Sequence, residues 1–181
     1  MRPIFTIHAG EYLVASEIEK RFPHLQVWIP SKDTGVDLLV TDNRQNKIVS
    51  LQVKFSKDYL GSSGEASSVP EIASTGWWTF QRGKIAQSAA DLWVLTLYQF
   101  QSRQFDFVFI SPQELLSRYE GLVSGVGAIQ SYVCVTSARR CWEVRGLGKE
   151  DMASIRAGTY ANTSRDFSAY LNAWPFTKQS K

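Results

Sequence analysis

The sequence predicts a layered domain of the α/β or α+β class. Stretches with the two-residue period of strands alternate along the chain with stretches that have the 3.6-residue period of helices. The chain has 181 residues, which is enough for one domain with a sizeable core. Apolar residues make up 44% of it and charged residues 20%, and these values are typical of globular proteins rather than of disordered or fibrous chains.

The N-terminal part begins with a helix over residues 10–22. Its apolar residues form one stripe, and Pro23 stands just beyond it, where a helix has to end. The stripe consists of Val14, Ala15, Ile18 and Phe22. A short strand is expected at residues 27–29. Residues 36–42 and 47–55 then alternate on either side of a polar turn, and this pattern predicts a β-hairpin.

The rest of the chain continues the alternation. Gly, Ser and Ala dominate residues 61–68, and we expect a flexible loop over 61–76. The elements expected next are a helix at 80–90, strands at 92–98 and 105–110, a helix at 112–119 capped by Ser111, and a hairpin of 131–136 with 141–144. We expect a single domain over 1–181, in which 145–181 is an appendage and the aromatic residues of 166–174 dock back on the domain.

Charge and cysteine content place few limits on function. The net charge of +3 does not by itself indicate a nucleic-acid partner. Basic residues are in excess in the C-terminal part, where they fit either a solvated surface or a phosphate-binding one: Arg139, Arg140, Arg145, Lys149, Arg156, Arg165, Lys178 and Lys181. The two cysteines flank an expected turn and could face each other across the hairpin, although two reduced thiols are the default.

The pattern of hydropathy indicates a cytoplasmic protein. No apolar run reaches the roughly 18 residues needed to cross a membrane, and the N-terminus lacks the apolar stretch of a signal peptide. We therefore expect no membrane partner.

Polar side chains are expected to converge on one face of the 36–55 hairpin. If Arg44 and Gln45 are the two central turn residues, Asp37 pairs with Gln52. Because side chains alternate between faces, Gln52 and Lys54 then share a face with Asp37. The alternative is a polar face that simply meets water and has no function.

The first helix offers a further acid. Glu11 falls on the apolar stripe, whereas Glu17 and Glu19 point away from it. A carboxylate at this place can serve a site on the sheet, or it can complement the dipole at the N-terminus of the helix.

These residues resemble the PD-(D/E)XK, or restriction-endonuclease-like, superfamily, and most closely its Mrr-like and archaeal Holliday-junction-resolvase-like branches. The resemblance rests on Gly-Glu-Tyr-Leu-Val-Ala-Ser-Glu-Ile at 10–18, Gly-Val-Asp-Leu-Leu-Val at 35–40 and Leu-Gln-Val-Lys at 51–54. It implies a mixed central β-sheet flanked by helices. Asp37 matches the motif Asp, Lys54 matches the motif Lys, and Glu11 matches the acid of the first helix. Gln52 stands where Glu or Asp is usual, in a Gln-x-Lys form similar to that of Mrr-like nucleases, and Val36 replaces the Pro.

The resemblance implies an endonuclease that hydrolyses DNA phosphodiester bonds with Mg²⁺, for which Mn²⁺ substitutes. Asp37 is the expected principal metal ligand, because Mg²⁺ prefers oxygen ligands and usually one or two carboxylates. Gln52 would ligate through its amide oxygen or through a water, and Glu11 would supply the negative charge that Gln52 lacks. Lys54 would position the attacking water or stabilise the developing charge. No organic cofactor is expected.

Other residues and other functions stay open at this point. Gln81, Arg82 and Lys84 either contact phosphates or form a solvated basic turn. Trp77 and Trp78 either stack on bases or anchor the core, and we expect core packing for at least one of them. His8 and His24 have no partner at metal-ligand spacing and are interpreted as structural.

Two rival functions also remain. A catalytically inactive nucleic-acid-binding or protein-interaction module would keep the fold, and an RNA-processing enzyme would use the same residues. A homodimer would suit cleavage of both strands.

Overall fold

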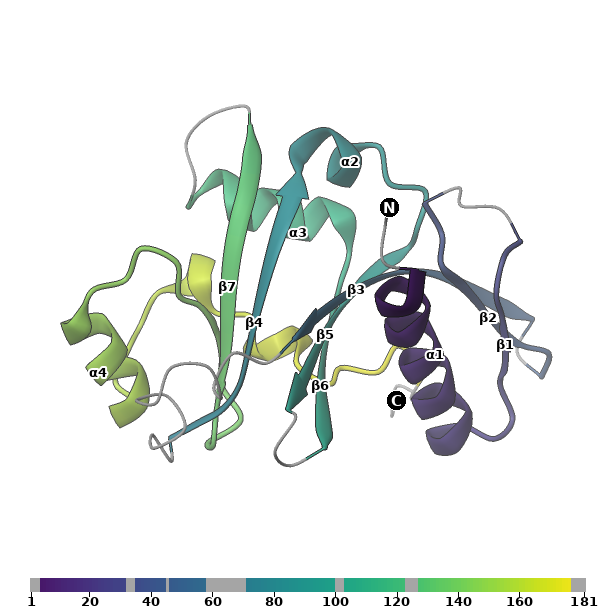
Figure 1. Cartoon of the computed structure of the whole chain (residues 1–181), viewed down its shortest axis with the longest axis horizontal. Helices are drawn as coiled ribbons and strands as arrows, with labels where there is room; N and C mark the ends of the chain where they lie inside the picture. Colours follow the sequence, from purple (N-terminus) through teal and green to yellow (C-terminus); the bar gives the residue numbers. More distant parts are fainter. Residues whose placement is uncertain are drawn as a thin grey trace.

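The structure is a computed structural model, and it describes residues 4–31, 35–44, 46–57, 71–99, 103–122 and 127–176. Within these residues the strands form two sheets, shown in Figure 1. The larger sheet has the order β1 (Gln26–Trp28), β2 (Leu38–Asp42), β3 (Lys47–Lys57), β5 (Leu92–Gln99), β6 (Gln104–Ile110). The smaller has the order β4 (Ile72–Gln81), β7 (Ala128–Thr136), β8 (Cys141–Glu143).

The larger sheet is mixed and helices flank it, as predicted. β3 pairs with β5 in parallel, whereas the other neighbours in this sheet are antiparallel. The helices are α1 (Ile4–Arg21), α2 (Arg82–Ala86), α3 (Pro112–Glu120) and α4 (Lys149–Ala157), with short 3₁₀ turns η2 (Thr163–Arg165) and η3 (Ser168–Tyr170). In the described part of the chain no helix is both long enough and apolar enough to span a membrane.

Helix α1 lies across one face of the larger sheet (Figure 1). It begins at Ile4, earlier than the expected residue 10. The predicted stripe is confirmed, because Val14, Ala15 and Ile18 are buried in one cluster with Leu38 and the neighbouring strand residues. The helix also comes very close to β3 at one point. A Cβ added to Gly10 would lie 2.6 Å from the Cβ of Phe55, so only glycine permits this approach.

The β2–β3 hairpin has the register that the sequence predicts. Leu38 pairs with Leu51 and Asp42 pairs with Lys47. The apolar residues of this hairpin bury one face against α1, and this burial specifies the register, because a slip of one residue would turn them to the opposite face.

The smaller sheet packs against the other face of the larger one, with α3 at the same core. Trp78 and Phe80 of β4 contribute to this core, while Trp77 and Thr79 face outward. The expected helix at 80–90 is therefore wrong at its start, where residues 80 and 81 end β4, and α2 has only five residues. Pairing of β4 with β7 along its length explains the extended conformation.

The expected loop at 61–76 falls mainly on residues that lie outside the described ones. Its last part is wrong, because residues 72–76 belong to β4.

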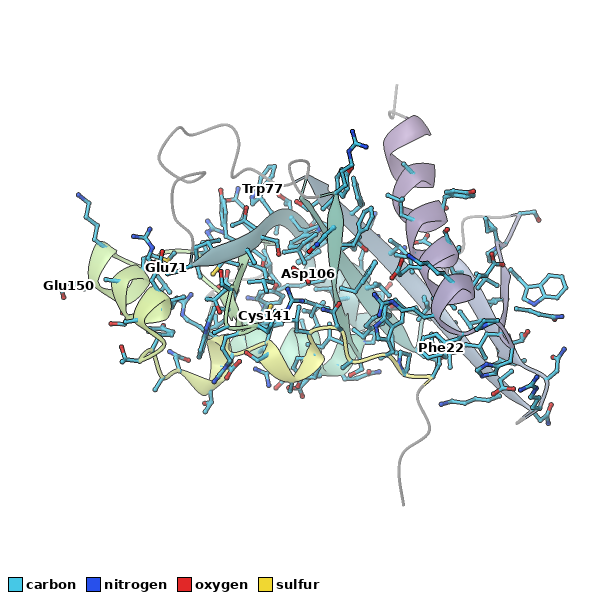
Figure 2. The ribbon with its side chains drawn as sticks, turned by 90° about the horizontal axis from the view of Figure 1, so that it is seen from below. Phe22, Glu71, Trp77, Asp106, Cys141 and Glu150 are labelled. Atoms are coloured by element: carbon cyan, nitrogen blue, oxygen red, sulfur yellow. The ribbon has the colours of Figure 1, made fainter. Side chains whose placement is uncertain are left out.

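The C-terminal part docks on both sheets. The aromatic residues of 166–174 pack on the domain as predicted: Phe167 is fully buried in the core between the sheets, and Trp174 contacts Phe22 and Phe107. Figure 2 shows the yellow C-terminal segment passing close to the labelled Phe22. Helix α4, which the sequence analysis did not predict, packs on the smaller sheet over Trp142.

The hairpin of β7 and β8 is confirmed, but its cysteines do not face each other. Cys134 packs with α4, whereas Cys141 lies in the core between the sheets. Both are free thiols, and burial raises the pKa of Cys134 to about 12.

Several basic residues of the C-terminal part form ion pairs with acids of this chain. Arg139 pairs with the buried Asp106, Arg140 pairs with Asp166, and Arg165 pairs with the buried Glu143 at 2.7 Å.

Candidate functional site on the β2–β3 hairpin

Asp37 lies immediately before β2, at the place where the pairing of β2 with β3 ends. Its N–H donates to Leu51 O at 2.8 Å, and its Oδ2 accepts from the N–H of Val53 at 2.6 Å. Peptide N–H groups of a strand lie in the plane of the sheet. The carboxylate therefore replaces the next carbonyl of β2 as the acceptor, and it lies at the rim of the sheet rather than above one face.

Gln52 is in direct contact with this carboxylate, as the predicted pairing requires. Its Nε2 donates to the same Oδ2 of Asp37 at 2.7 Å. Gly35, two residues before Asp37, has φ of +82°, a left-handed conformation that favours glycine. A Cβ on Gly35 would lie 3.8 Å from Gln52 Oε1, so the turn before β2 passes beside the amide oxygen.

The two carboxylate oxygens of Asp37 differ in their contacts with the described residues. Both protein hydrogen bonds of the carboxylate go to Oδ2. Within the described residues, Oδ1 has no hydrogen-bond partner. The carboxylate is thus fixed through one oxygen and can offer the other.

Lys54 follows two residues after Gln52 on the same side of β3, about 7 Å along the strand. Its Nζ lies 5.2 Å from the ring centroid of Trp93, a cation–π distance. Trp93 stands opposite Gln52 in the parallel pairing of β3 with β5, and its Nε1 donates to Ser88 Oγ at 2.9 Å. The ammonium group therefore lies over a buried, hydrogen-bonded indole that stands opposite Gln52.

Glu11 approaches from the helix side of the sheet. Only 8% of it is exposed, and it lies on the buried stripe of α1, whereas Glu17 forms an ion pair with Arg21 at 2.5 Å. Gly10 packs on Phe55, the residue after Lys54, so the turn of α1 that carries Glu11 lies against the end of β3. On β3, Leu51 and Val53 pack with α1, whereas Gln52 and Lys54 alternate with them and lie on the face of the sheet that carries Trp93.

The donor atoms of this site fit a hard divalent cation. Asp37 Oδ1, the amide oxygen of Gln52 and the carboxylate of Glu11 are all oxygen donors, which Mg²⁺ prefers. In the described part of the chain, no three His, Cys, Asp or Glu side chains gather closely enough to hold a metal by themselves. Mg²⁺ commonly keeps several waters and substrate oxygens as ligands, so a single carboxylate oxygen with an amide beside it is a donor set that it accepts.

The structure adds an acid that the sequence analysis missed. Asp91 immediately precedes β5 and lies next to Ser50 of β3. Its Oδ2 accepts from both Ser50 N–H at 2.8 Å and Ser50 Oγ at 2.7 Å. The hydroxyl and backbone bonds from Ser50 lower the pKa of Asp91. These bonds join β3, just before Gln52, to the residue that precedes β5. No local sequence pattern predicts the contact between Asp91 and Ser50, because it depends on the parallel pairing of two strands that are distant in the sequence.

The predicted phosphate contacts lie at the end of β4. Gln81 is the last residue of that strand, and Arg82 and Lys84 are on α2, so they do not begin a long helix as expected. Gln81 and Lys84 are exposed. Trp78 is core, as expected for at least one of the two tryptophans, and its Nε1 donates to Lys54 O at 3.0 Å. Trp77 is 38% exposed.

His24 lies away from this site. His24 lies 4.0 Å from Asp42 at the opposite end of the hairpin. The side chain of His8 lies outside the described residues.

Comparison with protein-family models, with curated proteins and with solved structures finds no match to this chain.

Proposed function

We propose that this chain is a metal-dependent endonuclease of the PD-(D/E)XK type, which hydrolyses DNA phosphodiester bonds with Mg²⁺ or Mn²⁺. The observation that carries the proposal is the state of Asp37. Its Oδ2 is fixed by Gln52 and Val53 while its Oδ1 has no partner in the described residues. A carboxylate held in this way, with an amide and an ammonium group beside it, suits phosphodiester chemistry.

The roles of the side chains follow from their charges. Asp37 and Glu11 supply negative charge for a cation, and Gln52 supplies a neutral oxygen. When bound, the cation would stabilise charge on the phosphate and favour ionisation of the attacking water. Lys54 is a compact cation on the same side of β3, and it would orient that water or stabilise charge as it develops on the phosphate. Trp93 keeps the ammonium group in place.

A second function is favoured by one specific contact. Gln52 donates an N–H to Asp37, so the amide already stabilises the carboxylate without a cation. A catalytically inactive nucleic-acid-binding or protein-interaction module would keep such a pair for stability alone.

A cleavage assay separates the two functions. Supercoiled plasmid and labelled linear and branched DNA are incubated with the protein in Mg²⁺, in Mn²⁺ and in EDTA. The nuclease proposal predicts cleavage that needs the cation and that is lost in Asp37→Asn, while the circular dichroism spectrum stays that of the wild type. The absence of cation-dependent cleavage of every substrate, or equal cleavage by Asp37→Asn, would contradict it.

A further inference from the structure

The outer face of the smaller sheet carries an exposed aromatic pair. Trp77 on β4 and Tyr132 on β7 are paired in the strand register, with ring centroids 6.2 Å apart and planes inclined by 35°. They are 38% and 43% exposed. Figure 2 shows Trp77 on the side of β4 that faces away from the labelled interior residues Asp106 and Cys141.

Helix α4 covers only part of this face. It packs over Cys134 and Trp142, beyond Tyr132 along β7. The outward positions on the remaining part of the face are all exposed, and all of them are neutral: Thr79, Gln81, Ala128 and Gln130. An open sheet face with two large rings, two amides and no acid is therefore left beside α4.

Positive charge borders this open face. Lys84 is exposed on α2, directly after β4, and Arg82 is on the same short helix. On the other strand, Arg145 donates from Nη1 to Gln130 O at 3.0 Å, which holds a guanidinium group beside β7. Aromatic rings bordered by cations suit a ligand that has both π faces and phosphates.

The aromatic pair is connected to the candidate site through β3. Ser56 Oγ accepts from Trp77 N–H at 2.8 Å and donates to Trp77 O at 3.0 Å. Ser56 stands two residues after Lys54, about 7 Å along the strand. The carbonyl of Lys54 also accepts from the Trp78 indole. The face and the candidate site are thus joined by hydrogen bonds through β3.

We propose that the outer face of β4 and β7 binds an unpaired polynucleotide strand, whose bases stack on Trp77 and Tyr132 and whose phosphates meet Lys84, Arg82 and Arg145. The inference rests on the proposed function in one respect: if the chain is a nuclease, this face determines which form of nucleic acid reaches the Asp37 site. Stacking needs bases that are free of a duplex, so a single-stranded tail or flap is bound rather than continuous double helix.

The test measures affinity without cleavage. Fluorescence anisotropy of labelled dT20, rU20 and a 20-base-pair duplex is followed in EDTA with the wild type, Trp77→Leu, Trp77→Phe and Tyr132→Leu. Trp28→Leu is the matched control, because Trp28 is 55% exposed on the edge strand β1, far from β4 in Figure 1.

The expected result is that dT20 binds more tightly than the duplex. Trp77→Leu and Tyr132→Leu should each weaken its binding about tenfold, in line with the usual contribution of one stacked base. Trp77→Phe should keep most of the affinity, and Trp28→Leu should not change it. The rU20 arm shows whether the same face accepts RNA.

Two outcomes would overturn the inference: no binding of either single strand, which would leave the face to a protein partner, or equal losses in the Trp28→Leu control. These outcomes are distinct from failure of the proposed function. Binding in EDTA does not involve the cation, so single-strand binding without Mg²⁺-dependent cleavage would reject the nuclease alone. Cleavage with unaltered affinity in Trp77→Leu and Tyr132→Leu would reject the aromatic face alone.

Discussion

At the scale of single residues, we expect Gln52 to decide how the candidate site responds to a cation. Its amide N–H stabilises the Asp37 carboxylate at 2.7 Å. A glutamate at this position would place two carboxylates side by side, and like charges at such a distance repel each other unless a cation lies between them.

Gln52→Glu should therefore make stability depend on the cation. We expect a melting temperature below that of the wild type in EDTA, and a larger rise with saturating Mg²⁺ or Mn²⁺ than the wild type shows. Differential scanning fluorimetry measures both, with Gln26→Glu on the exposed strand β1 as the control. If the variant and the wild type respond equally to the cations, Gln52 is not beside a metal site.

Lys54 is expected to act on the transition state rather than on binding. Lys54→Ala should lower the single-turnover cleavage rate by about 10²–10³-fold, the usual loss for one such charge, and leave the affinity for DNA nearly unchanged. Lys54→Arg should not restore the full rate, because the guanidinium group is larger and planar. A loss of affinity with an unaltered single-turnover rate would show instead that Lys54 is only a phosphate contact.

At the scale of elements, α1 presents two acids in different directions. Glu11 is on the buried stripe, and Glu17 is paired with Arg21. Glu11→Gln should weaken metal binding and cleavage together, whereas Glu17→Gln should remove one surface pair of roughly 0.3–0.5 kcal/mol and leave both activities intact. Metal titration by calorimetry compares the two variants. If Glu17→Gln is the damaging change, Glu11 is not the acid of this site.

The elements that the sequence predicts well are those with local signals. The β2–β3 hairpin has a polar turn and strict alternation, so its register follows from short-range sequence, and the pairing of Asp37 with Gln52 follows from the register. The pattern does not show that Asp37 bends back to bind Val53 N–H. That contact depends on β2 ending there, which a strand pattern does not specify.

The elements that the sequence predicts poorly depend on pairing with strands that are distant in the sequence. Residues 80 and 81 were expected to be helical, yet pairing of Phe80 with Ile129 and of Gln81 with Ala128 extends β4. The expected loop fails at residues 72–76 for the same reason, because Thr75 and Gly76 pair with β7. Long-range pairing here overrides the local pattern.

At the scale of the whole molecule, the C-terminal segment is part of the fold. Phe167 is buried between the sheets with Tyr119, and Arg118 donates to Asp166 O at 2.7 Å and to Tyr170 Oη at 3.1 Å. The segment also pairs with β6 at Val108 and Leu171. The smaller sheet, which we did not predict from the sequence, therefore packs against residues from both the larger sheet and the C-terminal segment.

Phe167→Ala should destabilise the whole domain by about 3–5 kcal/mol, the usual cost of deleting a buried phenyl ring. Urea unfolding should show this loss in a single transition, because the ring contacts the core shared by both sheets. Tyr12→Ala, at a position that is 68% exposed, should change stability by less than about 0.5 kcal/mol. A small loss in Phe167→Ala would mean that the segment is a separate appendage.

The proposed function depends above all on a cation at Asp37, and a crystal soaked in Mn²⁺ tests this most directly. Anomalous diffraction at the manganese edge locates the ion without reference to activity. We predict a peak in coordination contact with Asp37 Oδ1, with Gln52 or Glu11 nearby and waters completing the shell, and no peak there in crystals of Asp37→Asn. Wild-type crystals that hold Mn²⁺ elsewhere and none at Asp37 would contradict the assignment of the site.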